Sequence, residues 1–276
     1  MARSVAGGPA PGSCEESNRI VPSKDISSIL ADWPYESGQI NVRKIRGQDG
    51  RIKIQMRVDL GVLQMEMDGR PDGQRPFGCE SLLAHHLEQV RQHTLRNGTE
   101  LGYELNRKQC RELRDEAAMY YQRYLALFVL EDFEGVERDT QRNLKVLDLC
   151  RKFAEDESDR YMLEQYRPYI VMMNTRAKAL RALEAGAAKS ALAHVEAGLQ
   201  ALKEFFASFN QPQAYYKSSE VRVLRKLRSR IKKGLPPDPV AELQKQLRRA
   251  VDEERYEEAA RLRDRLRSLG EAAGSE

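Results

Sequence analysis

The sequence predicts a mainly helical α+β fold made of a small antiparallel β-meander, an antiparallel helical bundle and a C-terminal helical hairpin. Between residues 40 and 67 apolar and polar residues alternate, a pattern typical of strands with one buried face. From residue 106 onward apolar residues recur at intervals of three and four, which indicates amphipathic helices. The 276 residues, of which 41% are apolar, suffice for a substantial core.

The predicted sheet is a three-stranded meander with one apolar and one charged face. Turn-forming Asp-Gly pairs at residues 49–50 and 68–69 punctuate its alternating segments. A lone sheet of this size needs a covering element that buries its apolar face. The helix predicted over residues 80–97 is the expected cover.

The middle of the chain contains a weak internal repeat. Residues 130–136 and 184–191 each place a short turn before a second helix that ends in a leucine. This arrangement resembles the helical hairpin of tetratricopeptide repeats, although the two copies are about 55 residues apart instead of the usual 34. We therefore expect an antiparallel bundle with tetratricopeptide-like hairpins.

These patterns divide the chain into six parts. They are a disordered tail (1–22), a domain of β-meander plus helix (23–100), a helical bundle (101–210), a basic helix and linker (211–237), a helical hairpin (238–270) and a second tail (271–276). The first tail is rich in Gly, Ala, Pro and Ser and has no apolar period, so nothing in it predicts a packed element.

Membrane, secreted and disulfide-rich classes are not expected. The chain has no apolar run near the roughly 20 residues of a membrane-spanning helix, and its first residues lack the apolar centre of a secretory signal. A cytoplasmic location is therefore expected. Cys14, Cys79, Cys110 and Cys150 form no C-x-x-C pair, which predicts reduced and mostly buried thiols instead of a zinc knuckle or a disulfide framework.

Candidate catalytic or ligand-binding groups are scarce. The histidines at positions 85, 86 and 93 include no i, i+4 pair, so we interpret them as surface or partly buried residues and expect no metal site. The loop at residues 68–74 has acids, glycines and an arginine that suit an anion or a sugar, but turn formation explains it more simply. Charged runs such as residues 138–142 are interpreted as solvated helix faces. No nucleophile, metal set or phosphate loop is complete, so no enzyme and no cofactor are expected.

The last element is predicted to be an antiparallel helical hairpin. Asp238 is suited to be its N-cap, and Pro239 occupies the first helical position. Two apolar series with intervals of three and four flank residues 252–256, the only break long enough for a turn. The series are Val240, Leu243, Leu247, Ala250 and Val251, followed by Ala259, Leu262, Leu266 and Leu269.

This hairpin closely resembles the UVR motif of the UvrB and UvrC repair proteins. The resemblance covers about 30 residues and rests on the leucine pair of the first helix, the aromatic in the turn, the Ala-Ala pair and the Leu-Arg-Asp triplet. It implies a non-enzymatic docking protein, linked to DNA repair or a stress response, that binds another protein or a second copy of itself. The implied docking residues are Leu243, Leu247, Tyr256, Ala259, Leu262 and Leu266.

The chain also departs from the known carriers of the motif. It has neither the G-x-x-x-x-G-K-[ST] loop of UvrB nor a nuclease constellation as in UvrC, and it lacks the C-x-x-C pairs of McsA-type kinase activators. Over its full length it is similar to bacterial proteins that join an N-terminal β region to a C-terminal UVR motif. Packing of the hairpin on the bundle, or a generic coiled coil, stays open as an alternative.

The second function class is sequence-independent binding of nucleic acid. Residues 217–233 contain eight basic residues and one acid, so attraction to polyanions is expected to be local. The phosphate-binding candidates are Arg222, Arg225, Lys226, Arg228, Arg230 and Lys233. The same segment has apolar residues that can bury one face, so a merely solvated basic helix is the competing interpretation.

Overall fold

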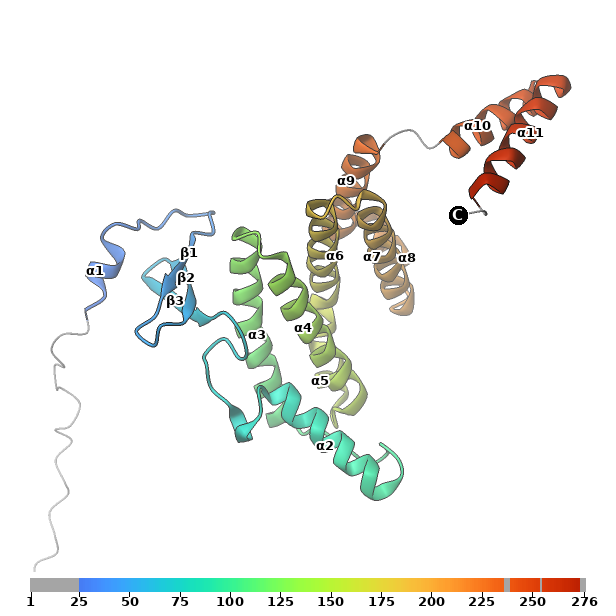
Figure 1. The fold of residues 1–276 in the computed structure, drawn as a ribbon. Coiled ribbons are helices and arrows are strands. Elements are labelled where there is room, and N and C mark those ends of the chain that lie inside the picture. Colours follow the sequence, from blue (N-terminus) through green and yellow to red (C-terminus); the bar gives the residue numbers. More distant parts are fainter. Residues whose placement is uncertain (1–24, 236–238, 254, 274–276) are drawn as a thin grey trace, which may run out of the picture.

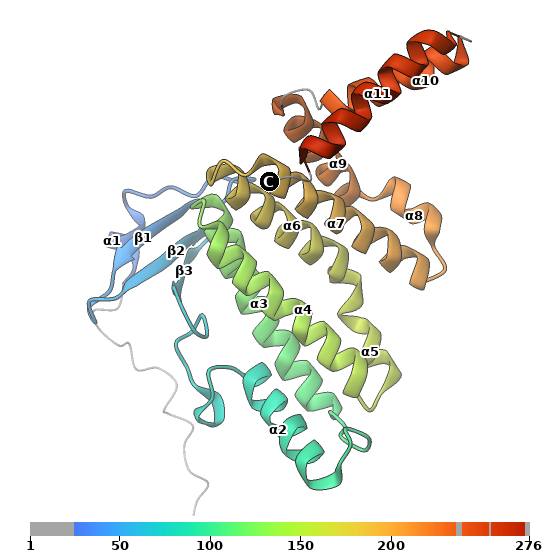
Figure 2. The same cartoon turned by 45° about the vertical axis from the view of Figure 1, so that its right-hand side comes forward.

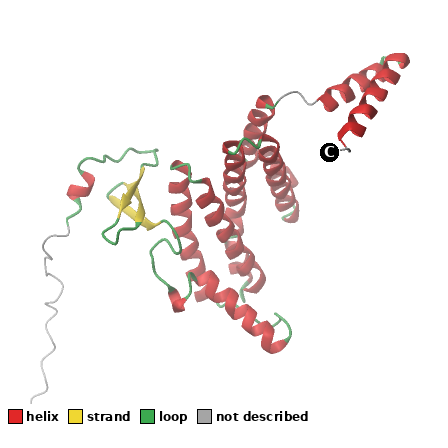
Figure 3. Ribbon diagram, viewed as in Figure 1, coloured by secondary structure: helices red, strands yellow, loops and turns green. Residues whose placement is uncertain are grey.

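The computed structural model describes residues 25–235, 239–253 and 255–273, and the predicted tail 1–22 lies outside them (Figure 1). A short helix α1 (Ser27–Leu30) precedes the strands β1 (Val42–Arg46), β2 (Ile52–Val58) and β3 (Gly61–Glu66) and a 3₁₀ turn η2 (Pro76–Gly78). The helices that follow are α2 (Leu82–Asn97), α3 (Arg107–Val129), α4 (Phe133–Phe153), α5 (Glu157–Met162), α6 (Arg167–Glu184), α7 (Ala188–Ser208), α8 (Pro212–Lys217), α9 (Ser219–Gly234), α10 (Pro239–Asp252) and α11 (Tyr256–Ala273), with a 3₁₀ turn η3 (Glu164–Tyr166) after α5. Strands are confined to the N-terminal part and helices make up the rest of the described chain, which confirms the predicted α+β class (Figure 3).

The sheet has the predicted meander topology. Its order is β1-β2-β3 with both pairs antiparallel, and Ile54 faces Met65 across the β2–β3 pair. The first turn contains Gly50 with a φ of 76°, a left-handed conformation that glycine adopts without strain. One face is apolar and the other polar, because β-strand side chains alternate in direction.

The cover of the sheet is α3, so the prediction that residues 80–97 cover it is wrong. Ile54, Met56 and Met65 of the sheet are buried in one core with Tyr124 and Leu127 of α3. The apolar residues of α2 belong instead to a second core around the N-terminal half of α3. In both views α2 lies at the end of α3 remote from the sheet (Figures 1 and 2). An amphipathic pattern shows that a helix face is buried, but it does not specify the partner.

Two helical hairpins form the bundle at the predicted turns. The chain reverses between α3 and α4 at residues 130–132 and between α6 and α7 at residues 185–187, where Gly186 has a φ of 73°. A methyl group on Gly198 would lie 2.2 Å from Thr175 Oγ1, so α6 and α7 approach too closely there for any side chain. The likeness to tetratricopeptide repeats and the domain boundaries stay predictions.

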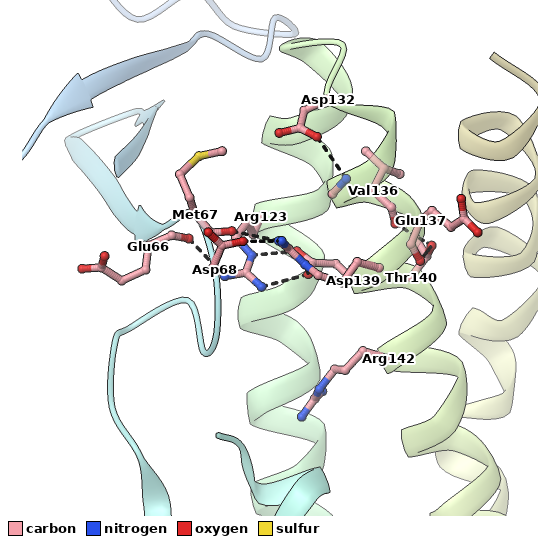
Figure 4. A network of polar contacts seen from close by, with 12 residues as sticks. Glu66, Met67, Asp68, Arg123, Asp132, Val136, Glu137, Asp139, Thr140 and Arg142 are labelled. Atoms are coloured by element: carbon pink, nitrogen blue, oxygen red, sulfur yellow. Dashed lines mark hydrogen bonds and ion pairs between the residues drawn. The ribbon is translucent and has the colours of Figure 1, made fainter. Parts of the chain in front are cut away.

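A buried polar network fastens the end of β3 to α3 and α4 (Figure 4). The Arg123 guanidinium donates to both carboxylate oxygens of Asp139, at 2.7 and 2.8 Å, and to the carbonyl oxygen of Glu66 at 3.0 Å. The side chains of Arg123 and Asp139 are each 1% exposed. Arg138 extends the network to the surface, where it donates to Asp68 at 2.7 Å. The sheet is therefore held on the bundle by ionic contacts as well as apolar ones.

Candidate functional site

The C-terminal hairpin projects from the bundle. Helices α10 and α11 pack against each other, and neither has a comparably extensive contact with another described element. In both views the pair lies beyond the C-terminal end of α9 (Figures 1 and 2). Two helices alone enclose too little volume to bury a complete apolar face.

The apolar seam of the hairpin, formed by Leu243, Leu247, Ala250, Leu262 and Leu266, is only partly covered. Leu243 is 8% exposed and Ala250 is fully buried, so these two residues contribute to the contact between α10 and α11. Leu247, Leu262 and Leu266 are only partly buried and retain apolar surface in contact with solvent. Covering apolar surface contributes roughly 25 cal/mol per Å², so the leucines that the hairpin leaves partly open are suited to a partner.

The turn of the hairpin presents an exposed aromatic ring among ion pairs. Tyr256 begins α11 and is 67% exposed. The carboxylate of Glu253 accepts from Arg249 at 2.8 Å and lies 2.7 Å from Arg255. The hydrogen bond from Arg249 holds the pKa of Glu253 below its usual value. Ala259, another predicted docking residue, has a side chain outside the described part, and the docking roles of all six residues stay predictions.

Six of the seven basic residues of α9 divide into two groups, and Arg225 is the seventh. Val221, Leu224, Leu227 and Ile231 are buried in the bundle core, so α9 does bury one face as the sequence suggested. Arg228 and Lys232 both lie 3.4 Å from Glu196 of α7. Arg222, Lys226, Arg230 and Lys233 are exposed. Among the described residues they have no carboxylate partner.

An exposed aromatic ring lies beside the unpaired group. Tyr216 of α8 is 64% exposed, and the Arg225 guanidinium lies 5.7 Å from the centre of its ring. Tyr216, Arg222, Arg225, Lys226 and Ser229 line an open hollow of about 400 Å³. Sequence reasoning identified the cations but did not separate the α7-facing pair from the others.

A second cluster of charges was missed from the sequence. Arg142 of α4 contacts Glu116 of α3, and its guanidinium lies 4.0 Å from the centre of the Tyr120 ring. Glu116 also accepts from the backbone N–H of Leu82 at 2.8 Å, so it fixes the start of α2. Burial and the neighbouring Arg70 lower the pKa of Arg142 to about 9. Asp139 and Arg142 thus lie in buried networks, so the prediction that residues 138–142 form a solvated face is wrong for these two residues, whereas Arg138 and Gln141 are exposed.

The cleft beside this cluster is a weaker candidate site. Its volume is about 410 Å³, and it lies among α2, α3, α4 and α6. Four of the five cations that line it are paired within the protein, for example Arg123 with Asp139 and Arg181 with Glu137 at 3.0 Å; the fifth is Lys145. No sequence motif indicates such a cluster, because partners such as Arg138 and Asp68 are 70 residues apart in the chain.

The described histidines and cysteines do not gather into a metal-binding cluster. His86 is buried deeper than predicted, and its Nδ1 lies 3.2 Å from the Tyr103 hydroxyl. His93 Nε2 lies 2.9 Å from the carbonyl oxygen of Leu101. Within the described ranges no group of three or more His, Cys, Asp or Glu residues is placed to hold a metal ion. Cys110 and Cys150 are free and buried and Cys79 is free and partly buried, whereas Cys14 lies outside those ranges.

Comparison with known proteins supports the assignment of the hairpin. A family model described as the UvrB/uvrC motif matches residues 238–272. The chain therefore carries a UVR motif, and the motif coincides with α10 and α11. No curated protein and no solved structure matches the chain. Among the described helices, none is both long and apolar enough to cross a membrane.

Proposed function

We propose that the chain is a non-enzymatic docking protein whose UVR hairpin binds another protein or a second copy of the chain. The observation that supports this most directly is the partly open seam of a hairpin with which no other described element makes an extensive contact. Leu247, Leu262 and Leu266 retain exposed apolar surface, although they belong to the most regular apolar series of the motif. The occurrence of the motif in UvrB and UvrC makes repair and stress-response proteins of the cytoplasm the first partners to test.

The physical argument rests on the limited stability of the hairpin. Helices of this length are only marginally stable in isolation, because helix nucleation is unfavourable and a short helix forms few hydrogen bonds to offset it. The ion pairs around Glu253 are exposed to solvent, where water and salt screen them, so they add little to the stability of the hairpin. Burial of the remaining seam against a second apolar surface would stabilise the hairpin and bind the partner at once.

The test is a charge placed in the seam. Leu262→Asp puts a carboxylate against apolar neighbours, and desolvating it costs several kcal/mol, enough to abolish a micromolar interaction. Gln246→Asp is the matched control, because residue 246 is an exposed position of α10 and receives the same carboxylate. Self-association is measured by sedimentation velocity over a concentration series, and partner binding by capture from an extract of the source organism.

The two variants together show whether the seam is the interface. We expect Leu262→Asp to lose association and Gln246→Asp to retain it, while thermal unfolding of the bundle is the same in both. Association that survives Leu262→Asp in a folded protein would show that the seam is not the interface. Simultaneous loss of association and of bundle stability would show that the hairpin packs on the bundle.

A further inference from the structure

The exposed face of α9 is a cationic stripe that no carboxylate of the described residues neutralises. Arg222, Lys226, Ser229 and Lys233 recur at intervals of three and four, so they lie along one face, with Arg230 at its flank. The opposite face is buried through residues such as Leu224 and is therefore fixed on α6 and α7. The stripe is thus rigidly presented, although Lys and Arg side chains can still move within it.

The length and spacing of the stripe fit a phosphate backbone. With a rise of 1.5 Å per residue, Arg222 and Lys226 are about 6 Å apart along the helix, and the stripe to Lys233 spans about 17 Å. A folded surface normally intersperses charges of both signs, as α9 itself does on the side of α7 where Glu196 pairs with Arg228. Cations left unpaired on one face attract polyanions and release their counterions on binding.

The exposed ring at one end of the stripe indicates which polyanion fits. Tyr216 borders the 400 Å³ hollow together with Arg222 and Lys226, so an aromatic face and phosphate-binding groups lie side by side. Proteins that bind single strands without sequence preference combine a basic groove with aromatic rings on which bases stack. A duplex does not offer its base faces for stacking, and an acidic peptide has no bases that could stack on the ring of Tyr216.

We propose that the stripe of α9, with Tyr216, is a sequence-independent binding site for single-stranded nucleic acid. Phosphates contact Arg222, Lys226, Arg230 and Lys233, and a base stacks on Tyr216. The site is separate from the UVR seam, since none of these residues belongs to α10 or α11.

The experiment compares two double variants of the full chain that remove equal charge. Arg222→Gln with Lys226→Gln removes two cations of the stripe, and Arg228→Gln with Lys232→Gln removes the two cations that pair with Glu196 on the side of α7. Binding of fluorescent dT and U 15-mers is measured by anisotropy at several salt concentrations. For about four phosphate contacts, the slope of log affinity against log salt is about −3 for a single strand, and loss of two contacts halves it.

The expected results are specific to the stripe and the ring. The stripe variant should lose roughly tenfold or more in affinity at low salt, and the α7-side variant should keep the affinity of the wild type within about twofold. Tyr216→Leu should lose about fivefold or more, and Tyr216→Phe should retain binding because the π-face remains. Circular dichroism checks that all four proteins are folded.

Several results would overturn the proposal. Equal losses in the two double variants would show that net charge alone governs binding, and the absence of binding to either oligomer at low salt would remove the site altogether. Equal affinity for a duplex of the same length, or for a polyglutamate peptide with the same dependence on Arg222 and Lys226, would assign the stripe to another partner.

Discussion

Removal of the Asp139 carboxylate tests whether the buried network holds the fold together. Asp139→Ala leaves the Arg123 guanidinium, 1% exposed, with the Glu66 carbonyl oxygen as its remaining acceptor at 3.0 Å. Arginine does not lose its proton under ordinary conditions, so the charge remains and is uncompensated. Breaking a buried pair in this way costs about 3–5 kcal/mol, a large part of a total stability of about 5–15 kcal/mol.

The chain contains a matched control for burial. Asp68 lies 2.7 Å from Arg138, the same distance that separates Asp139 from Arg123, but the Asp68 side chain is 87% exposed. Asp68→Ala should therefore cost at most about 1 kcal/mol. A third variant, Arg123→Met with Asp139→Leu, removes both charges and should be less destabilised than Asp139→Ala alone, because no buried charge is left without a partner.

The measurement is the free energy of unfolding from urea titrations followed by circular dichroism. The three variants should rank with Asp139→Ala the least stable, the double variant intermediate and Asp68→Ala close to the wild type. Equal losses for Asp139→Ala and Asp68→Ala would refute the reasoning, because distance and not burial would then determine the effect. So would a double variant less stable than Asp139→Ala.

Three further predictions concern packing, pH and chemistry. Gly198→Ala should destabilise the protein by about 1–3 kcal/mol, because the new methyl group meets Thr175 at 2.2 Å; a thermal melt at or above the wild-type midpoint would contradict this. Burial lowers the pKa of His86 below 6.5, so just below that pH the unfolded state binds more protons than the folded state. The free energy of unfolding should therefore keep its full contribution from His86 above about pH 6.5 and decrease as the pH falls below it. His86→Gln should weaken this pH dependence, measured as the unfolding midpoint at each pH. The purified protein should neither hydrolyse nucleotides nor retain zinc, since a phosphate loop and thiol pairs are missing from the sequence; one tightly held metal per chain in elemental analysis would disprove it.

Local patterns predicted the elements of the fold but not their partners. The meander, both bundle hairpins and the C-terminal hairpin follow from apolar period and turn residues, which act over a few positions. The position of α2 depends instead on Glu116, which is 34 residues from the N–H of Leu82 that it binds. A contact of that range leaves no periodic signal in a single sequence.

At the candidate sites, too, the sequence identified the charged residues but not their partners. Arg138, Asp139 and Arg142 resemble a solvated helix face in the sequence, because their partners Asp68, Arg123 and Glu116 lie elsewhere in the chain. On α9 the sequence identified every cation, but only the position of Glu196 on α7 shows which of them are already paired. Composition thus predicted where charge is concentrated, and the tertiary structure decided which charges remain available.

The two proposed surfaces respond differently to salt, and this difference can separate them in one experiment. The stripe of α9 binds by counterion release, so its affinity falls steeply as salt is added. The seam around Leu262 is proposed to bind by burial of apolar surface, which salts of the sulfate type strengthen. Because α9 directly precedes the hairpin in the chain, a partner protein and a nucleic acid would meet at the same end of the bundle. If salt releases the nucleic acid and leaves the protein partner bound, the two surfaces act independently. If both are released together, the protein partner is itself held through the nucleic acid, and the seam contributes little.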